Sequence, residues 1–319
     1  MVNSVNIQNF KSLRSVTFQP TRINLFIGEP NTGKSNILEA LAFFSPGVVR
    51  EPLFHELLRF KNTADLFFDQ RVSQPLCIDI GDFKVSLEFK EGMFQGTIHI
   101  NGTITARFVM SHSALIQWQD LRTTIRYYAF KPLTTFPNGQ PGNLISPFGE
   151  NLVAVLYSNE DLRQRIGAIV RSKGFRLQIK PTENELLIAK DVNDELYSYP
   201  WATVSETLRR IVFFMAVLET NENATLVLDE PEANTFPFYT KYLAERIALD
   251  SSNQFFITTH NPYLLSSIVE KAKSTELSVF VARMENFETK LSRIEDKRLP
   301  DLLELNSDAF FNLDKLVER

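Results

Sequence analysis

The sequence GEPNTGKS, from Gly28 to Ser35, decides the fold. It fits the pattern G-x-x-x-x-G-K-[ST] in full, and it lies between an apolar run at residues 23–27 and a segment at 36–44 whose apolar residues recur at helical spacing. Glycines let backbone N–H groups converge on phosphate oxygens, and the N-terminus of the following helix adds positive potential. The stretch therefore predicts a phosphate-binding loop between a strand and a helix, in an α/β fold.

Two residues of this loop have specific expected roles. Lys34 is expected to reach the β- and γ-phosphates of a triphosphate, and the Ser35 hydroxyl is expected to bind Mg²⁺. The other residues expected to contact the nucleotide are Gly28, Asn31, Thr32, Gly33 and Asn36. The predicted ligand is thus a magnesium-bound nucleoside triphosphate.

Residues 226–230 read LVLDE and place two carboxylates at the end of an apolar, strand-like run. In open α/β sheets, ligands bind at the carboxyl ends of the strands. Because neighbouring residues on a strand point to opposite sides, we expect Asp229 to hold the magnesium shell and Glu230 to polarise the attacking water as general base. A plain strand end or a helix cap would show the same pattern.

Residues 255–260 read FFITTH and end another apolar run with a histidine. His260 follows Asp229 by 31 residues, which is enough for one helix and one strand. A parallel neighbouring strand would therefore bring His260 beside the same phosphates, where its imidazole could contact the γ-phosphate. The alternative is a surface histidine before the turn at Asn261-Pro262.

Composition excludes several classes of protein. The 44% hydrophobic and 23% charged residues are typical of a globular chain rather than a disordered one. Cys77 is the only cysteine, which excludes an internal disulfide and favours a cytoplasmic protein. The net charge of −4 does not indicate a nucleic-acid surface, although a local basic patch is compatible with it. The longest strongly apolar stretch, residues 213–218, is far shorter than the roughly 18 residues of a membrane span, so no membrane association is expected.

The pattern along the chain predicts two lobes. Period-two alternation over residues 77–110 predicts an antiparallel β layer, and residues 151–173 and 208–218 have helical spacing. Short apolar runs at 225–228 and 255–258 predict buried parallel strands. We expect a nucleotide lobe at about 1–74 plus 206–319, and an inserted β-rich and helical lobe at about 75–205.

Three motifs in order carry a family resemblance: the phosphate loop, LDEPEA at residues 228–233 and TTHNP at 258–262. This order resembles the ABC-type ATPase heads of the SMC, RecF and OLD group, and most of all the compact AAA-family ATPases (AAA_21/AAA_15-like) of bacterial defence and toxin-like operons. The resemblance implies a P-loop NTPase with an ABC-ATPase-head-like mixed sheet, an antiparallel β layer and a helical lobe. It also implies ATP and Mg²⁺ as ligands and slow ATP hydrolysis, with Lys34, Glu230 and His260 as catalytic residues.

The same resemblance assigns further residues. Asn9-Phe10-Lys11-Ser12 is similar to the N-terminal strand turn that lies near the nucleotide in this group, so Lys11 is an expected contact. SETLR at residues 205–209 resembles the signature whose first residue touches the γ-phosphate bound by the opposite subunit, although the family's glycine is missing. Ser205 is therefore an expected contact in trans, and a helix-capping box of Thr203 and Glu206 is the structural alternative. The glutamine of a Q-loop is not placed, because Gln117 and Gln140 are both candidates.

The resemblance implies a dimer of heads around two ATP molecules that acts as a switch for an effector, a nuclease or toxin encoded nearby. Because 59 residues follow His260, we do not expect the TOPRIM nuclease domain that some OLD proteins carry. Two alternatives stay open: an ATP-gated scaffold with little hydrolysis, and a RecF-like DNA-binding repair ATPase.

Overall fold

The computed structural model describes residues 1–46, 53–113, 115–117, 123–305, 310 and 313. Its centre is a six-stranded sheet in the order β16-β15-β3-β14-β13-β9, in which the five strands from β15 to β9 are parallel and β16 is antiparallel. These strands are β3 (Ile23–Ile27), β9 (Ile125–Tyr128), β13 (Thr225–Asp229), β14 (Gln254–Thr258), β15 (Leu277–Glu285) and β16 (Glu288–Arg293). The apolar runs predicted as buried parallel strands are therefore confirmed.

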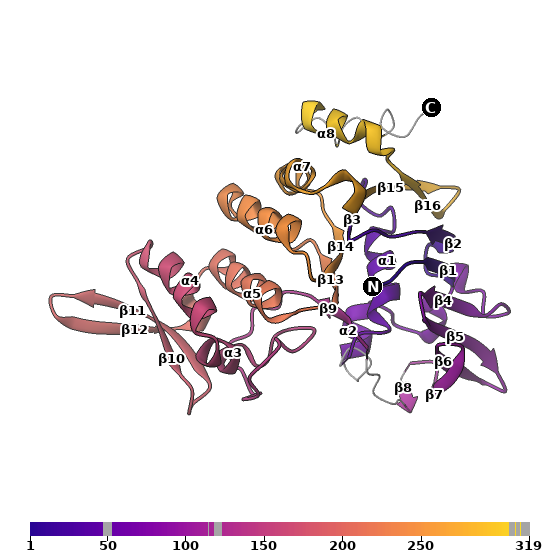
Figure 1. The fold of residues 1–319 in the computed structure, drawn as a ribbon. Coiled ribbons are helices and arrows are strands. Elements are labelled where there is room, and N and C mark those ends of the chain that lie inside the picture. The colour runs from indigo at the N-terminus through magenta and orange to yellow at the C-terminus, as the bar shows by residue number, and fades with distance from the viewer. Residues whose placement is uncertain (47–52, 114, 118–122, 306–309, 311–312, 314–319) are drawn as a thin grey trace.

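The central sheet is covered on both faces. Leu226 and Leu228 of β13 belong to one core cluster, whereas Val227 between them belongs to the other. One face packs against α5 (Glu206–Thr220), α6 (Pro237–Leu249) and α7 (Pro262–Lys271). The other face packs against α1 (Lys34–Ala42) and a second sheet (Figure 1). Because side chains alternate across a strand, a continuous apolar run is the sequence that fits this double burial.

The second sheet is antiparallel and has seven strands in the order β2-β1-β4-β5-β6-β7-β8. They are β1 (Val5–Phe10), β2 (Leu13–Phe18), β4 (Leu76–Ile80), β5 (Phe83–Lys90), β6 (Met93–Ile100), β7 (Thr103–Met110) and β8 (Leu115–Gln117). The expected antiparallel layer is present, but the expected lobe boundaries at residues 75 and 205 do not coincide with the sheets. Strand β4 pairs with β1 of the N-terminal hairpin, and β9 pairs with β13 in the central sheet.

A helical lobe lies beside α5 and ends in a projecting hairpin of β11 and β12 (Figure 1). The predicted helix at 151–173 forms two helices, α3 (Leu152–Ser158) and α4 (Glu160–Arg171), because the Asn159 side chain caps α4 by accepting the N–H of Leu162. Three antiparallel strands follow, β10 (Arg176–Lys180), β11 (Glu185–Val192) and β12 (Glu195–Pro200).

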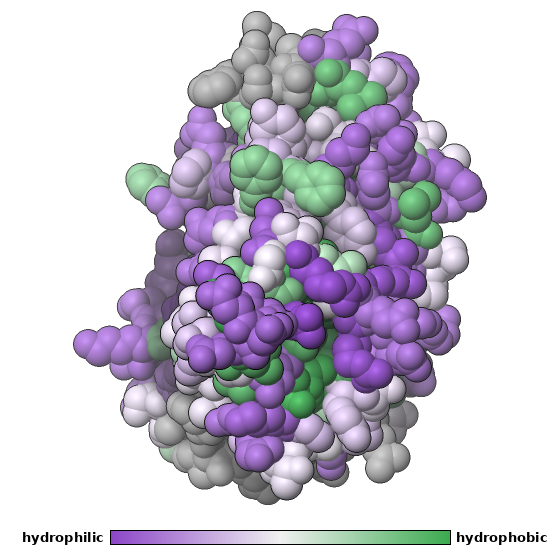
Figure 2. Space-filling model, turned by 90° about the vertical axis from the view of Figure 1, so that its left-hand side faces the viewer, coloured by the Kyte–Doolittle hydropathy of each residue, from purple (hydrophilic) through white to green (hydrophobic). Residues whose placement is uncertain are grey.

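The remaining elements are short. They are α2 (Leu53–Leu58), α8 (Leu299–Leu305) and the 3₁₀ turns η1 (Thr63–Leu66), η2 (Phe68–Gln70), η3 (Trp201–Thr203), η4 (Ser274–Glu276) and η5 (Asp296–Arg298). Across the described ranges, no helix combines the length and apolarity needed to cross a membrane. The side of the molecule on the left of Figure 1 is mainly hydrophilic, with small separate hydrophobic patches (Figure 2).

Candidate nucleotide-binding site

The phosphate loop connects β3 to α1 and depends on two glycines. Gly33 has φ +90°, and a Cβ there would lie 2.1 Å from the hydroxyl oxygen of Thr289 and 2.6 Å from that of Ser12. Gly28 has φ +147°, and a Cβ there would lie 2.3 Å from the Ala282 carbonyl oxygen. Glycine is therefore required at both positions by backbone conformation and by close packing.

Lys34 begins α1, and its ammonium group lies inside the loop. The ammonium donates to the carbonyl oxygens of Gly28, at 3.0 Å, and of Glu29, at 2.7 Å. Burial lowers the pKa of Lys34, whereas the carboxylates of Glu230 and Asp229 act to raise it. The cation is thus held among backbone oxygens and faces the two acidic residues from β13.

Ser35 and Asp229 meet as the sequence predicts, although 194 positions separate them. The Ser35 hydroxyl donates to Asp229 Oδ1 at 3.3 Å, and the Thr258 hydroxyl donates to the same oxygen. Hydroxyl and carboxylate oxygens suit Mg²⁺, which takes one or two protein ligands and completes its shell with phosphate oxygens and water.

Glu230 and His260 lie together at the carboxyl ends of β13 and β14. These strands are parallel neighbours with Asp229 opposite Thr258, and Nε2 of His260 is 3.3 Å from Oε1 of Glu230. Burial lowers the pKa of His260, Lys34 lowers it further, and Glu230 opposes both. Glu230 has a left-handed φ of 44°, and its N–H donates to the Thr258 hydroxyl at 3.1 Å. The expected proximity of the histidine to the acidic pair is present.

A pocket of about 360 Å³ opens over the loop, and this volume lies within the usual range for a ligand site. It is lined by Ser12, residues 30–36, Arg59, Glu230 and His260. Sequence reasoning missed Ser12 and Arg59 as lining residues. Ser12 accepts a hydrogen bond from the Asn36 amide at 2.8 Å, which ties the N-terminal turn to the loop.

The expectation for Lys11 needs correction. Lys11 does not line this pocket, because its ammonium group is paired with Glu39 on α1 and donates to the carbonyl oxygen of Leu58. Its side chain is 11% exposed. The turn therefore presents Ser12, and not Lys11, to the loop.

Ser205 is the N-cap of α5 and accepts the N–H of Leu208 at 3.4 Å. The alternative of a cap at Thr203 is wrong, since the Thr203 hydroxyl donates to the Pro200 carbonyl instead. The Thr207 hydroxyl donates to the carbonyl of Asn234, so the start of α5 contacts the segment that follows the acidic pair. Ser205 is exposed and does not line the pocket of its own chain.

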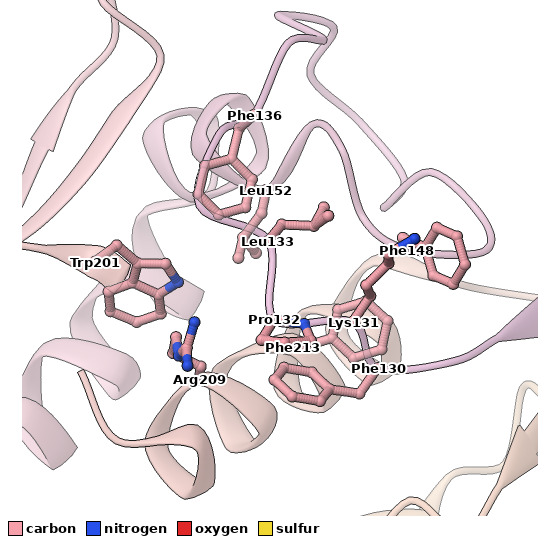
Figure 3. A pocket seen from close by; sticks show the side chains of 10 residues that line it. All are labelled: Phe130, Lys131, Pro132, Leu133, Phe136, Phe148, Leu152, Trp201, Arg209 and Phe213. Atoms are coloured by element: carbon pink, nitrogen blue, oxygen red, sulfur yellow. The ribbon is translucent and has the colours of Figure 1, made fainter. Parts of the chain in front are cut away.

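A small aromatic crevice of about 10 Å³ lies at the base of α5 and outside the phosphate pocket. Figure 3 shows Trp201 and Arg209 on its left side and Phe130 and Phe213 along its lower edge. These side chains fix the start of α5 against the helical lobe. The two Q-loop candidates stay unassigned: Gln117 lies on the edge strand β8, and Gln140 lies in a segment that Asn151 anchors.

Comparison with known families matches two consecutive parts of the chain. Residues 1–95 match a family described as "AAA ATPase domain", and residues 118–266 match one described as "AAA domain, putative AbiEii toxin, Type IV TA system". A comparison with curated proteins gives no match.

Two solved structures of SMC heads are similar to the chain. The SMC head bound to the C-winged helix domain of ScpA is 13% identical, covers 93% of this chain and 99% of its own, and superposes with a TM-score of 0.52. The SMC head domain from Thermotoga maritima is 12% identical, and the match covers 92% of this chain and 99% of that domain with a TM-score of 0.44. At such identity the first likeness is one of fold alone. The two family matches, each over less than half of the chain, and this fold agree with the resemblance to ABC/SMC-like AAA ATPases that the motifs carry.

Proposed function

We propose that the protein hydrolyses ATP with Mg²⁺, dimerises head to head around two ATP molecules, and acts as a nucleotide-dependent switch for an effector, a nuclease or toxin encoded nearby. The observation that carries the proposal is the convergence of Lys34, Ser35, Asp229, Glu230 and His260 at one site. The pocket supplies a binding site for phosphate groups. The strand ends supply oxygen ligands for Mg²⁺ and a carboxylate beside an imidazole. These are the parts that phosphoryl transfer to water needs.

The residues of the site have separate roles in this scheme. The ammonium of Lys34 stabilises negative charge on the transferred phosphoryl group, and the Glu230 carboxylate accepts a proton from the attacking water. His260 is 3.3 Å from Glu230 and orients that carboxylate or contacts the γ-phosphate. Mg²⁺, when bound at Ser35 and Asp229, would neutralise charge on the phosphate oxygens.

Dimerisation is supported by the position of Ser205 and by exposed apolar residues. Ser205 lies outside its own pocket, so a contact with a γ-phosphate requires a second head. Phe236 and Phe238, at the start of α6, are 67% and 69% exposed. Phe236 comes two residues after Asn234, whose carbonyl contacts the start of α5. The exposed phenylalanines and Ser205 therefore lie on adjoining parts of the surface. The SMC head of the first comparison structure is bound to another protein, ScpA, and a protein partner is part of the proposal for this chain too.

The proposal is tested with Glu230→Gln and Lys34→Ala. Glu230→Gln should retain ATP binding, lose phosphate release and accumulate as an ATP-bound dimer in light scattering. Glu245→Gln, on the surface of α6, is the control for loss of a carboxylate. A wild-type rate of phosphate release in Glu230→Gln would refute the base assignment. Lys34→Ala should abolish ATP binding, and unchanged ATP affinity in calorimetry would overturn the loop assignment.

A second candidate function is an ATP-gated scaffold with little hydrolysis. It is favoured by the missing signature glycine, because Thr207 follows Glu206 directly where the family's pattern has a glycine, and the Glu206 carboxylate accepts hydrogen bonds from Asn234 and Arg210. A backbone without glycine approaches a phosphate less closely. ATP-driven dimerisation without phosphate release under saturating ATP would select the scaffold.

A further inference from the structure

Glu39 is a buried carboxylate that pairs with two cations beside the phosphate pocket. It lies on α1, five residues after Lys34, and its side chain is 2% exposed. Its Oε2 accepts from the ammonium of Lys11, and its Oε1 accepts from Nε of Arg59 at 2.7 Å and from Nη2 of the same side chain. One carboxylate thus joins the N-terminal turn, the helix of the phosphate loop and the residue that follows α2.

The charges in this cluster depend on one another. A buried carboxylate is costly unless it is paired and hydrogen-bonded, and Glu39 has both cations as partners. Burial acts to lower the pKa of Arg59, but the interactions with Glu39 outweigh it and the pKa is raised. Burial lowers the pKa of Lys11, and Glu39 opposes this effect. Glu39 therefore favours the charged form of both partners.

Arg59 is the member of the cluster that faces the pocket. Its side chain is 58% exposed and lines the pocket with Lys34 and Ser35. Its Nε and Nη2 are used by Glu39, whereas Nη1 makes no hydrogen bond to any residue that the structure describes. A guanidinium has five N–H donors in a planar fork that matches phosphate oxygens. Arg59 therefore has donors left for an anionic ligand while Glu39 fixes the plane of the group.

Backbone conformation makes this positioning necessary. Lys11 and Arg59 both have left-handed φ values, 49° and 44°, which long side chains rarely adopt. Such strained conformations persist only where contacts with the surrounding structure hold them in place. The Lys11 N–H donates to the carbonyl of Leu66 at 2.9 Å and its ammonium donates to that of Leu58, so Glu39 is the side-chain link that connects both strained residues to α1.

We propose that Glu39 is a positioning residue for the triphosphate: it holds the Arg59 guanidinium at the rim of the phosphate pocket and, through Lys11, fixes the turn that carries Ser12. This inference rests on the proposed function, because it takes ATP as the ligand of the pocket. Glu39 does not line the pocket, so it acts on the nucleotide through Arg59 and the turn. Its loss is expected to weaken ATP binding and to leave the chemical step intact.

The test compares Glu39→Gln with wild type in ATP affinity, by calorimetry, and in turnover at saturating ATP. Glu39→Gln should weaken ATP binding about tenfold, the lower end of the effect seen when an outer partner that orients a ligand is removed, with turnover changed less than about twofold. Glu39→Asp should recover part of the affinity. In an Arg59→Gln background, Glu39→Gln should cause a smaller loss of affinity than in the wild type, because one of the two groups that it positions is absent.

The control is Glu219→Gln, which also removes a carboxylate shared by two cations, Arg165 and Arg246, away from the pocket. If Glu39→Gln fails to fold because Lys11 is left unpaired, the double variant Lys11→Met/Glu39→Gln removes both charges and should show the same loss of affinity. Unchanged ATP affinity in folded Glu39 variants, or full additivity with Arg59→Gln, would overturn the inference. Wild-type protein that does not bind ATP would instead refute the proposed function.

Discussion

Glu232 should make the stability of the protein depend on pH. Its side chain lies three residues after Asp229, is 3% exposed, and accepts a hydrogen bond from the Thr259 hydroxyl through Oε1. Oε2 has no hydrogen-bond partner among the described residues. Burial, which outweighs the bond from Thr259, raises the pKa from 4.5 to about 7, and the nearby Glu230 adds to the increase. The folded protein therefore retains a proton on this carboxyl at pH values where the unfolded chain has lost it.

The sign and size of the effect follow from these two pKa values. Because the folded state binds the proton more tightly, the contribution of Glu232 to stability is fully present below pH 4.5. This contribution is lost as the pH rises to about 7. At about 1.36 kcal/mol for each pKa unit, ionisation costs roughly 3 kcal/mol of unfolding free energy. The neutral variant Glu232→Gln does not ionise, so it should not carry this penalty.

Urea unfolding followed by circular dichroism at pH 5, 6, 7 and 8 measures this difference. Glu232→Gln should be more stable than the wild type by less than about 1 kcal/mol at pH 5, and the difference should grow to roughly 3 kcal/mol at pH 8. Glu183→Gln, which neutralises an exposed carboxylate, controls for the change of net charge. A difference that is constant with pH, or one that grows as the pH falls, would refute the reasoning.

Three further predictions concern the site. Gly33→Ala should abolish ATP binding in calorimetry and should lower the unfolding free energy by more than the control Gly174→Ala. Gly174 has a similar φ of +79° but open space around it, so its substitution should cost only the roughly 1–2 kcal/mol of a left-handed backbone conformation. Thr258→Val should slow phosphate release about 10- to 100-fold with ATP still bound, because the hydroxyl that orients Asp229 is removed; an unchanged rate would exclude this role. Ser205→Ala should cost about 1 kcal/mol of helix stability, which Ser205→Asn restores as an alternative cap. ATP-dependent dimerisation should fall in both Ser205 variants, and normal dimerisation of the asparagine variant would leave only the capping role.

The central sheet and the core of the site could be predicted from the sequence because each rests on a local pattern. Residues 225–228 and 255–258 are continuous apolar runs, and a strand buried on both faces needs such a run. The place of His260 followed from the chain length between it and Asp229, since a crossover of one helix brings the next strand alongside. The phosphate loop needs only its own eight residues and the helix after it.

The remaining features depend on tertiary contacts that no local pattern encodes. Alternation over residues 77–110 predicts strands, but it does not reveal that β4 pairs with β1 and extends the N-terminal hairpin. Strand β9 has four residues, too few for a reliable period. Arg59 and Glu39 meet across 20 positions and neither lies in a recognisable motif, so sequence reasoning identified neither of them.

Backbone strain around the pocket explains why these tertiary contacts matter. Lys11, Asn31, Arg59 and Glu230 have φ values of 49°, 62°, 44° and 44°, and each left-handed residue other than glycine costs on the order of 1–3 kcal/mol. Asparagine tolerates this conformation, but the other three need support from their surroundings. Glu39 pairs with two of them, and the Thr258 hydroxyl accepts the N–H of Glu230. Glu39 and Thr258 thus stabilise a strained arrangement that brings cations and carboxylates to one pocket, and a substitution that relaxed the backbone would gain stability at the expense of the site.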